Sequence, residues 1–264
     1  MRSRILALSF IFSFVLGQTY VPDDNFEQAL IDLGYDDVLD DYVLTANISG
    51  VDYLNVNYKD ISDLTGIGDF TALTHLYGWG NSLTSLDVSA NTALTNLQVP
   101  YNDVMTSLVG YENNTALTTL HCQGNQLTSV DVSLNTALTA LRCGRNSLTS
   151  LDVSTNTALT ELSCGENSLT SLDVSNNTAL TQLSCDYNYL TSLDVSTHTY
   201  LASLSCQNNF LTSLDVSNNT LLTSFRCENN SLSSLDVSSN TFLTWLDAGG
   251  NNYPSLDVSN NTFL

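Results

Sequence analysis

Apolar and polar residues alternate along most of this chain in a pattern that repeats every 21 residues. One complete period runs from Leu159 to Ala179 and reads LTELSCGENSLTSLDVSNNTA, and the same phrase recurs from about Leu73 to the last residue. Around Leu162 and again around Leu172 every second residue is apolar, which predicts strands with one buried face and no helix inside the repeat. A fixed period of this length predicts a solenoid, so we expect one elongated domain of about ten coils, with strands on both faces.

The least common residue types keep the same register. The six cysteines follow each other at intervals of 21 residues, namely Cys122, Cys143, Cys164, Cys185, Cys206 and Cys227. An asparagine follows three residues after each of them, and a second asparagine column runs through Asn135, Asn156, Asn177, Asn219, Asn240 and Asn261, with His198 in the remaining slot. The repeat therefore has the form L-x-x-L-x-C-x-x-N-x-L, and its second half, LTSLDVSNNTA, restates the first.

This phrase resembles the leucine-rich-repeat signature, with cysteine in the third apolar slot. The nested halves are similar to the short repeats of secreted bacterial leucine-rich-repeat proteins, and YVPDDNFEQALIDLGYDD resembles the opening of such proteins from Bacteroidota. The resemblance implies a mostly β, right-handed leucine-rich-repeat solenoid with a short N-terminal α-helical cap. It also implies that the asparagine of each bend turns inward and bonds the backbone.

The chain divides into three segments by composition. Residues 1–17 begin with Arg2 and Arg4, continue as an apolar run and end in small residues, which predicts a secretory signal peptide. Residues 18–50 predict the cap, whose helix would start with a capping box of Asp24 and Glu27 and stop at Gly34. Its buried face would consist of Phe26, Ala29, Leu30 and Leu33.

Residues 51–264 form the predicted solenoid, and two coils break its regularity. Residues 51–72 are a degenerate first repeat in which Lys59 replaces the asparagine. The step from Val99 to Cys122 is 23 residues, so the extra pair predicts a local loop around residues 105–112. The sequence stops at Leu264, the first leucine of another repeat, from which we expect that the C-terminal cap is missing.

The charge of the chain restricts its partners. The formal net charge at pH 7 is −21, and beyond the signal only Lys59, Arg142, Arg145 and Arg226 are basic. Binding of nucleic acid or anionic lipid needs many lysines and arginines, so neither is expected as a partner. The signal and the lack of a second long apolar run predict a secreted or cell-surface protein without membrane insertion. We also expect a monomer.

The cysteine and aspartate columns each have two interpretations. The cysteines could form disulfides, but each takes an inward slot equivalent to leucine, so buried free thiols are the preferred prediction. An outward aspartate column includes Asp152, Asp173, Asp194 and Asp215, each between two serines. Hydrogen bonds to serine and to the backbone are the simpler explanation, and a row of weak calcium sites on these aspartates is the alternative.

The positions that vary between repeats are the outward ones around L-x-C, on a face expected to be concave. Aromatic residues and arginine are common anchors of recognition surfaces, and they gather at these positions. The predicted ligand-binding residues are Tyr77, Trp79, Gln98, Tyr101, His121, Arg142, Arg145, Glu161, Tyr187, Arg226 and Trp245.

These residues predict an extracellular binding or adhesion module for a protein or glycan. A structural acidic rod that spaces the cell surface without a specific ligand is the alternative. Acidic residues recur in every coil, whereas catalysis needs one singular site, so neither an enzyme nor a cofactor is expected.

Overall fold

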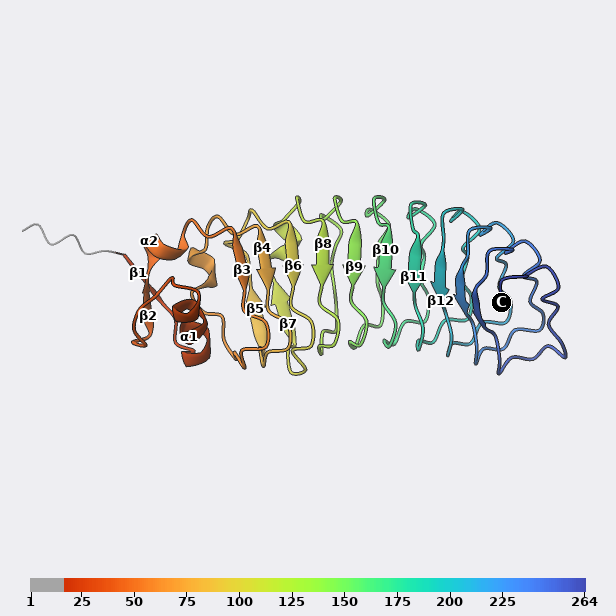
Figure 1. Ribbon diagram of the computed structural model, residues 1–264, viewed down its shortest axis with the longest axis horizontal. Coiled ribbons are helices and arrows are strands. Elements are labelled where there is room, and N and C mark those ends of the chain that lie inside the picture. Colours follow the sequence, from red (N-terminus) through yellow and green to blue (C-terminus); the bar gives the residue numbers. More distant parts are fainter. Residues whose placement is uncertain (1–16) are drawn as a thin grey trace, which may run out of the picture.

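The computed structural model describes residues 17–264 as a single elongated solenoid, along which the chain advances coil by coil (Figure 1). The predicted signal peptide lies outside the described residues, apart from Gly17. Each coil contributes one short strand to a 10-stranded sheet in which every pairing is parallel. These strands are β3 (Tyr53–Asn55), β4 (His75–Tyr77), β6 (Asn96–Gln98), β8 (Thr119–His121), β9 (Ala140–Arg142), β10 (Glu161–Ser163), β11 (Gln182–Ser184), β12 (Ser203–Ser205), β13 (Ser224–Arg226) and β14 (Trp245–Asp247).

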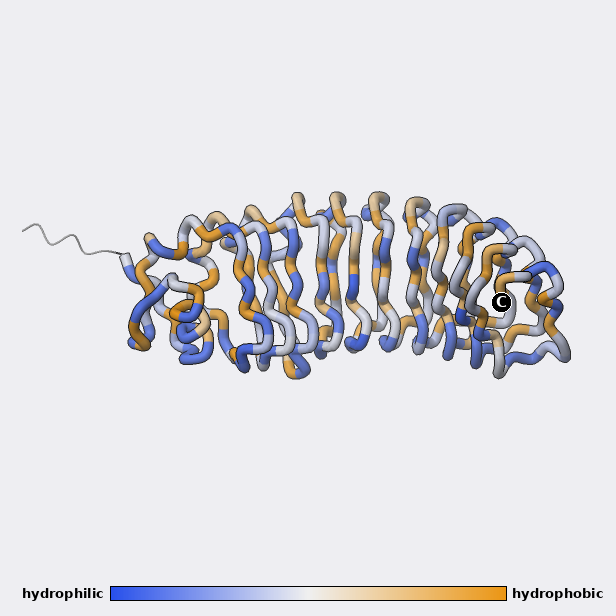
Figure 2. The backbone as a smooth tube through the Cα atoms, viewed as in Figure 1, coloured by the Kyte–Doolittle hydropathy of each residue, from blue (hydrophilic) through white to orange (hydrophobic). Residues whose placement is uncertain are grey.

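The register of this sheet places equivalent residues side by side. Leu162 of β10 pairs with Leu141 of β9 and with Leu183 of β11, so that the pairing follows the 21-residue step of the sequence. The middle residue of each strand points into the coil, and the leucines, valines and cysteines of all coils form one continuous core. Figure 2 shows the resulting apolar bands at the same height in successive coils.

Strands occur on the second face only near the N-terminal end. There β5 (Ser85–Asp87) pairs with β7 (Ser107–Val109), and no other strand is assigned to this face in the described chain. The expectation of strands on both faces therefore holds for one pair of coils. In the following coils the equivalent segments, such as residues 171–174, lie side by side without a hydrogen-bonded ladder.

The extra residues of the irregular coils form short 3-10 helices. These are η1 (Ile67–Asp69) and η2 (Tyr111–Asn113), and each is entered through a glycine with positive φ, Gly66 or Gly110. The predicted loop around residues 105–112 is therefore wrong, because this segment contains β7 and the start of η2. The Tyr111 side chain is buried, and its hydroxyl accepts a hydrogen bond from the Asp131 N–H, which anchors the insertion to the next coil.

The six cysteines are free and buried, as the inward register predicts. Burial raises the pKa of the thiols, to about 12 for Cys122 and Cys164. A buried, protonated thiol acts as a small apolar side chain, so this column contributes packing to the core.

The two asparagine columns hold the bends together in different ways. In the first column Asn167 donates to the carbonyls of Cys143 and Cys164, and its Oδ1 accepts from the N–H of Leu148 in the preceding coil. In the second column Asn177 donates to the carbonyls of Val153 and Asn156, but its Oδ1 is buried without a partner. Both columns confirm the predicted inward ladder.

His198 takes the place of an asparagine in the second column. Its ring is buried and Nε2 lies 3.0 Å from the carbonyl oxygen of Val174, the position that an asparagine amide takes in neighbouring coils. This bond shows that histidine can replace asparagine at this bend.

The N-terminal cap contains a helix, as predicted, but it is built differently in detail. The helix α1 spans Asp24–Asp32, and its N-cap is Asp23, whose carboxylate accepts from the N–H groups of Asn25 and Phe26. The predicted capping box of Asp24 and Glu27 is wrong, because the Glu27 carboxylate is buried and accepts from the backbone of Asp40, Asp41 and Tyr42.

The remaining cap elements cover the first coil. Phe26, Ala29 and Leu30 are buried as expected, whereas Leu33 is 43% exposed, since it lies at the end of the helix. The cap also includes an antiparallel pair of β1 (Gln18–Tyr20) and β2 (Tyr42–Leu44), followed by α2 (Thr45–Ile48). None of the helices in the described chain has the length and apolarity that crossing a membrane requires.

Candidate functional site

The exposed side of the ten-stranded sheet carries most of the variable residues. We call this surface the sheet face and define it as the first and third residue of each strand together with the second and third residue after the strand. In the coil of β10 these are Glu161, Ser163, Gly165 and Glu166. All eleven predicted ligand-binding residues lie on the sheet face.

The third residue after each strand has a left-handed backbone. Its φ lies between 49° and 69° in every coil from Tyr58 to Gly250. Three coils have glycine there and two have asparagine, the residue types that accept this conformation most easily. In the other five coils the position holds Tyr58, Tyr101, Arg145, Glu166 and Tyr187, for which the conformation costs about 1 kcal/mol or more each.

The N-terminal part of the sheet face carries an aromatic cluster of Tyr53, His75, Tyr77, Trp79 and Tyr101. The ring centroids of Tyr53 and Tyr77 lie 5.3 Å apart, and the Trp79 and Tyr101 rings meet edge to face at 6.3 Å. Trp79 Nε1 donates to Gln98 Oε1 at 3.2 Å, which fixes the indole. The cluster contains three of the predicted residues, Tyr77, Trp79 and Tyr101, and a fourth, Gln98, is hydrogen-bonded to Trp79.

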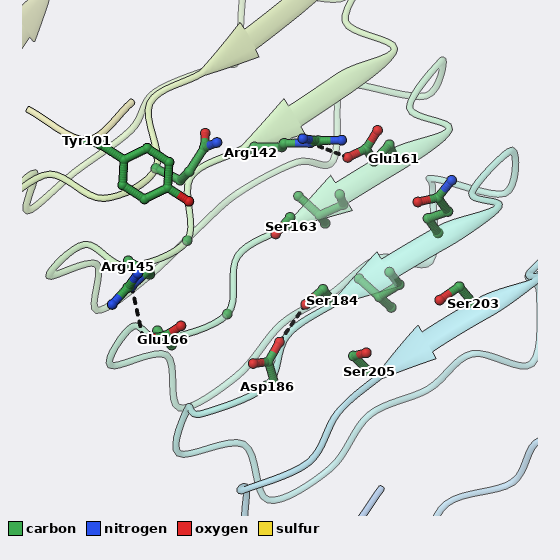
Figure 3. A pocket seen from close by; sticks show the side chains of 16 residues that line it. Tyr101, Arg142, Arg145, Glu161, Ser163, Glu166, Ser184, Asp186, Ser203 and Ser205 are labelled. Atoms are coloured by element: carbon green, nitrogen blue, oxygen red, sulfur yellow. Dashed lines mark hydrogen bonds and ion pairs between the residues drawn. The ribbon is translucent and has the colours of Figure 1, made fainter. Parts of the chain in front are cut away.

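Next to this cluster the sheet face is hollowed into a polar depression of about 350 Å³ (Figure 3). Its floor is low because Gly144 and Gly165 have no side chains and because serines occupy the strand positions of the next coils. A Cβ on Gly165 would lie 2.5 Å from Asp186 Oδ1, so a larger residue there would displace the Asp186 carboxylate from its place in the depression. The hydroxyl of Ser184 donates to that carboxylate.

Two ion pairs form one wall of the depression. Arg142 Nε donates to Glu161 Oε1, and Arg145 Nε lies 3.2 Å from Glu166 Oε2 (Figure 3). Tyr101 stands beside them and also lines the depression. Four of the predicted residues, Tyr101, Arg142, Arg145 and Glu161, are thus brought together from three different coils.

His121 lies between the aromatic cluster and this wall, and it is only 8% exposed. Neither ring nitrogen has a hydrogen-bond partner in the protein. Burial and the nearby Arg142 guanidinium lower the pKa of His121 to about 4, so its ring is neutral at pH 7. A buried neutral imidazole offers one donor and one acceptor to a ligand.

The remaining predicted residues lie farther along the sheet face. Tyr187 is 54% exposed in the coil of β11 and does not line the depression. Arg226 of β13 stands over the indole of Trp245 in β14, with its guanidinium carbon 5.8 Å from the ring centroid. This pair is separate from the cluster around Tyr101.

Sequence reasoning missed the residues that form the floor of the depression. Gly144, Gly165, Ser163 and Ser184 vary between repeats as much as the arginines do, but small side chains were given no role. Asp186 was likewise left out of the predicted site. A run of small residues at variable positions in consecutive coils was the available signal.

The aspartate column is explained by local hydrogen bonds. In the coil of β10 the Asp173 carboxylate accepts from the N–H of Ser175, and the pattern recurs at Asp152, Asp194 and Asp215. Hydrogen bonds from the hydroxyl and the backbone N–H of that serine lower the pKa of each aspartate. Among residues 17–264 there is no group of three or more acidic, histidine or cysteine side chains that could hold a metal ion, so the calcium alternative gains no support.

Comparison with known proteins identifies the fold. No protein-family model and no curated protein matches the chain. Among solved structures it is similar to the functional domain of InlJ from Listeria monocytogenes, which includes a cysteine ladder, with 32% identity over 94% of this chain and a TM-score of 0.66. The chain spans 65% of the length of that solved domain.

Two further structures show the same architecture. An internalin from Listeria monocytogenes, inlF, is 22% identical over 93% of this chain and 81% of its own, with a TM-score of 0.76. A leucine-rich-repeat protein from Leptospira interrogans is 22% identical over 75% of this chain and 61% of its own, with a TM-score of 0.61. The chain therefore folds as a mostly β leucine-rich-repeat solenoid of the internalin-like kind, as its repeat predicts.

Proposed function

We propose that this protein is an extracellular adhesion module whose sheet face binds a protein or glycan. The observation that carries this proposal is the set of side chains in left-handed backbone, Tyr101, Arg145, Glu166 and Tyr187 among them. Each costs stability at a position where glycine would fit without strain, and such strain is typical of functional positions.

The arrangement of the sheet face supports the same function. Large aromatic rings stand next to a polar depression with two arginines, a combination common at the centre of protein interfaces. The 21-residue frame repeats with little change, whereas the sheet face differs from coil to coil, so that specificity can be set there without altering the core. The similarity to the functional domain of InlJ agrees with this interpretation.

An array experiment tests the proposal. Fluorescently labelled protein comprising residues 18–264 is applied to arrays of glycans and of extracellular-matrix proteins. For any probe bound by the wild type, the combined variant Trp79→Ala, Tyr101→Ala and Arg145→Ala should bind at least about tenfold more weakly, because it removes anchors from the aromatic cluster and the depression.

A matched control separates recognition from general surface effects. The combined variant Ser171→Ala, Ser192→Ala and Ser213→Ala changes three exposed residues on the second face and should bind as the wild type does. Circular dichroism of both variants checks that the solenoid is intact. If neither variant changes binding to any probe, the sheet face is not the recognition surface, and the acidic rod without a specific ligand becomes the better description.

A further inference from the structure

Several buried polar atoms without a hydrogen-bond partner in the protein lie on the sheet face. Within residues 17–264, and apart from Asp36, Asn91 and the second asparagine column, such side-chain atoms belong only to His121, Gln123, Gln207 and Glu228. Buried polar groups are almost always paired in native proteins, so unpaired acceptors at a surface site are free to accept hydrogen bonds from a partner. The four residues lie on both sides of the polar depression.

Gln207 and Glu228 continue a line that begins at Asp186. The three residues take the same position in the coils of β11, β12 and β13, the second residue after each strand, and we call them the acceptor column. The N–H of Tyr187 donates to the Gln207 carbonyl, and the N–H of Asn208 donates to the Glu228 carbonyl, both at 3.0 Å. Neighbouring members are therefore about 5 Å apart along the solenoid.

The acceptor column offers oxygen atoms, and none of its members forms an ion pair within residues 17–264, although Arg226 lies near enough to lower the pKa of Glu228. Gln207 is only 7% exposed, and its Oε1 and the Oε2 of Glu228 have no partner. None of the three ion pairs in the described part of the chain includes Asp186 or Glu228. Burial, and after it the nearby carboxylates of Asp247 and Asp186, raise the pKa of Glu228, and they outweigh the lowering effects of a backbone hydrogen bond and of the Arg226 guanidinium.

The oxygen atoms of the acceptor column determine which chemical group would bind them. Two carboxylates and an amide oxygen require several hydrogen-bond donors and a positive charge, which lysine and arginine side chains supply together. Calcium prefers six to eight oxygen ligands, and a column of three side chains along a sheet does not enclose an ion. The net charge of −21 would also attract a basic partner over distance.

We propose that the acceptor column binds a lysine or arginine side chain of a partner protein, with Asp186 and Glu228 on either side of the cation and Gln207 Oε1 accepting one of its hydrogen bonds. This inference rests on the proposed function, because it assigns a ligand class to the same face. It adds a subsite at the C-terminal end of the polar depression, beyond the residues predicted from the sequence.

Titration with short peptides tests the subsite directly. The probe is a nine-residue peptide with three lysines separated by glycine and serine, and its matched control carries acetyl-lysine at the same positions. Binding to the whole chain is followed by NMR with ¹⁵N-labelled protein. We expect the lysine peptide to shift the Gln207 side-chain amide and the backbone amides of Cys206 and Glu228, and the acetylated peptide to shift none of them.

Charge-matched variants distinguish the subsite from diffuse attraction. Asp186→Asn and Glu228→Gln should each raise the Kd for the lysine peptide at least tenfold. Asp236→Asn, which removes one negative charge from an exposed position on the second face, should change the Kd less than twofold. Equal effects of all three variants, or the same shifts produced by Ca²⁺ or spermidine alone, would overturn the proposal.

The outcome is separable from the test of the proposed function. If the lysine peptide fails to bind while the Trp79, Tyr101 and Arg145 variant still loses its array ligand, the adhesion module remains and the cationic subsite is wrong. If the peptide binds at the acceptor column but the arrays show no role for the sheet face, the cationic subsite is supported and the proposed adhesion function is wrong.

Discussion

The two asparagine columns should differ in their contribution to stability, although their side chains are identical. In Asn167→Ala, the N–H of Leu148 loses its only acceptor inside a fully buried bend. An orphaned buried N–H costs about 2 kcal/mol, and each of the two amide hydrogens, which are shared among the carbonyls of Cys143, Cys164 and Gly165, accounts for about 1 kcal/mol more. The expected loss is therefore about 4 kcal/mol.

Asn177→Ala removes the same atoms with a smaller effect. The carbonyls of Val153 and Asn156 lose the Asn177 amide but keep the N–H groups of Asn156 and Leu159 as donors. No N–H is orphaned, and the variant also removes the unpartnered Oδ1 of Asn177. The two lost hydrogen bonds reduce the free energy of unfolding by about 2 kcal/mol, and removal of the unpartnered oxygen restores about 1 kcal/mol. The net loss of stability is therefore about 1 kcal/mol.

Urea unfolding followed by circular dichroism measures both variants, fitted with a nearest-neighbour scheme suited to repeat proteins. A histidine pair serves as a second comparison: Asn177→His should be tolerated as His198 is, whereas Asn167→His cannot both accept from Leu148 and donate to two carbonyls. If the two alanine variants differ by less than about 1 kcal/mol, the unequal roles assigned to the Oδ1 atoms are wrong.

Three further predictions follow from single residues. Glu166→Gly should raise the free energy of unfolding by about 0.5 to 1 kcal/mol, because glycine adopts the left-handed backbone without strain and only one exposed ion pair is lost. A lower stability of the variant in urea would contradict this. Cys164 has a pKa of about 12 and should resist iodoacetamide at pH 8 until the chain is unfolded, as mass spectrometry can show; rapid labelling of the native protein would refute its burial. The pKa of His121 in the folded chain is about 4, below its ordinary value of 6.5, so the unfolded chain binds the proton more tightly. The free energy of unfolding should therefore fall by up to about 3 kcal/mol as the pH drops from 6.5 to 4. His121→Asn should remove this part of the pH dependence, as unfolding measured at several pH values would show.

Much of the solenoid could be predicted because equivalent residues stack at a fixed step. Once Cys143 and Cys164 are known to differ by one period, their shared inward slot, free thiols and parallel strands follow from packing. The asparagine ladders follow in the same way, because an inward amide must find a partner. The difference between the two columns could not be predicted, since it depends on which backbone N–H lies opposite each Oδ1.

The cap and the irregular coils were predicted less accurately because their residues occur once. Asp23 and Asp24 are both plausible N-caps in the sequence, and only the position of the following turns decides between them. Likewise, the extra residues before Tyr111 could form a loop or a 3-10 turn, and the burial of that ring selects the turn.

The candidate site was predicted through its large side chains and missed where side chains are small. Tyr101 and Arg145 are conspicuous in the sequence, whereas the depression exists because Gly144 and Gly165 leave space two coils wide. Their effect depends on register and on the direction of neighbouring side chains, which a single repeat does not reveal. The left-handed position was also invisible, because five large or charged residues occupy a place typical of glycine.

The first asparagine ladder runs in one direction, since each coil completes the bend of the coil before it. If a 21-residue unit were duplicated or deleted in register, its asparagine would accept from the leucine N–H of the coil before it, and its own leucine N–H would donate to the asparagine of the coil after it. The contacts between neighbouring coils would therefore stay the same. Coils can thus be added or lost during evolution without requiring a new type of contact between coils. Each such event would move the arginine wall and the acceptor column apart or together by one rung, which changes the spacing of a bound partner's contacts while the framework stays constant.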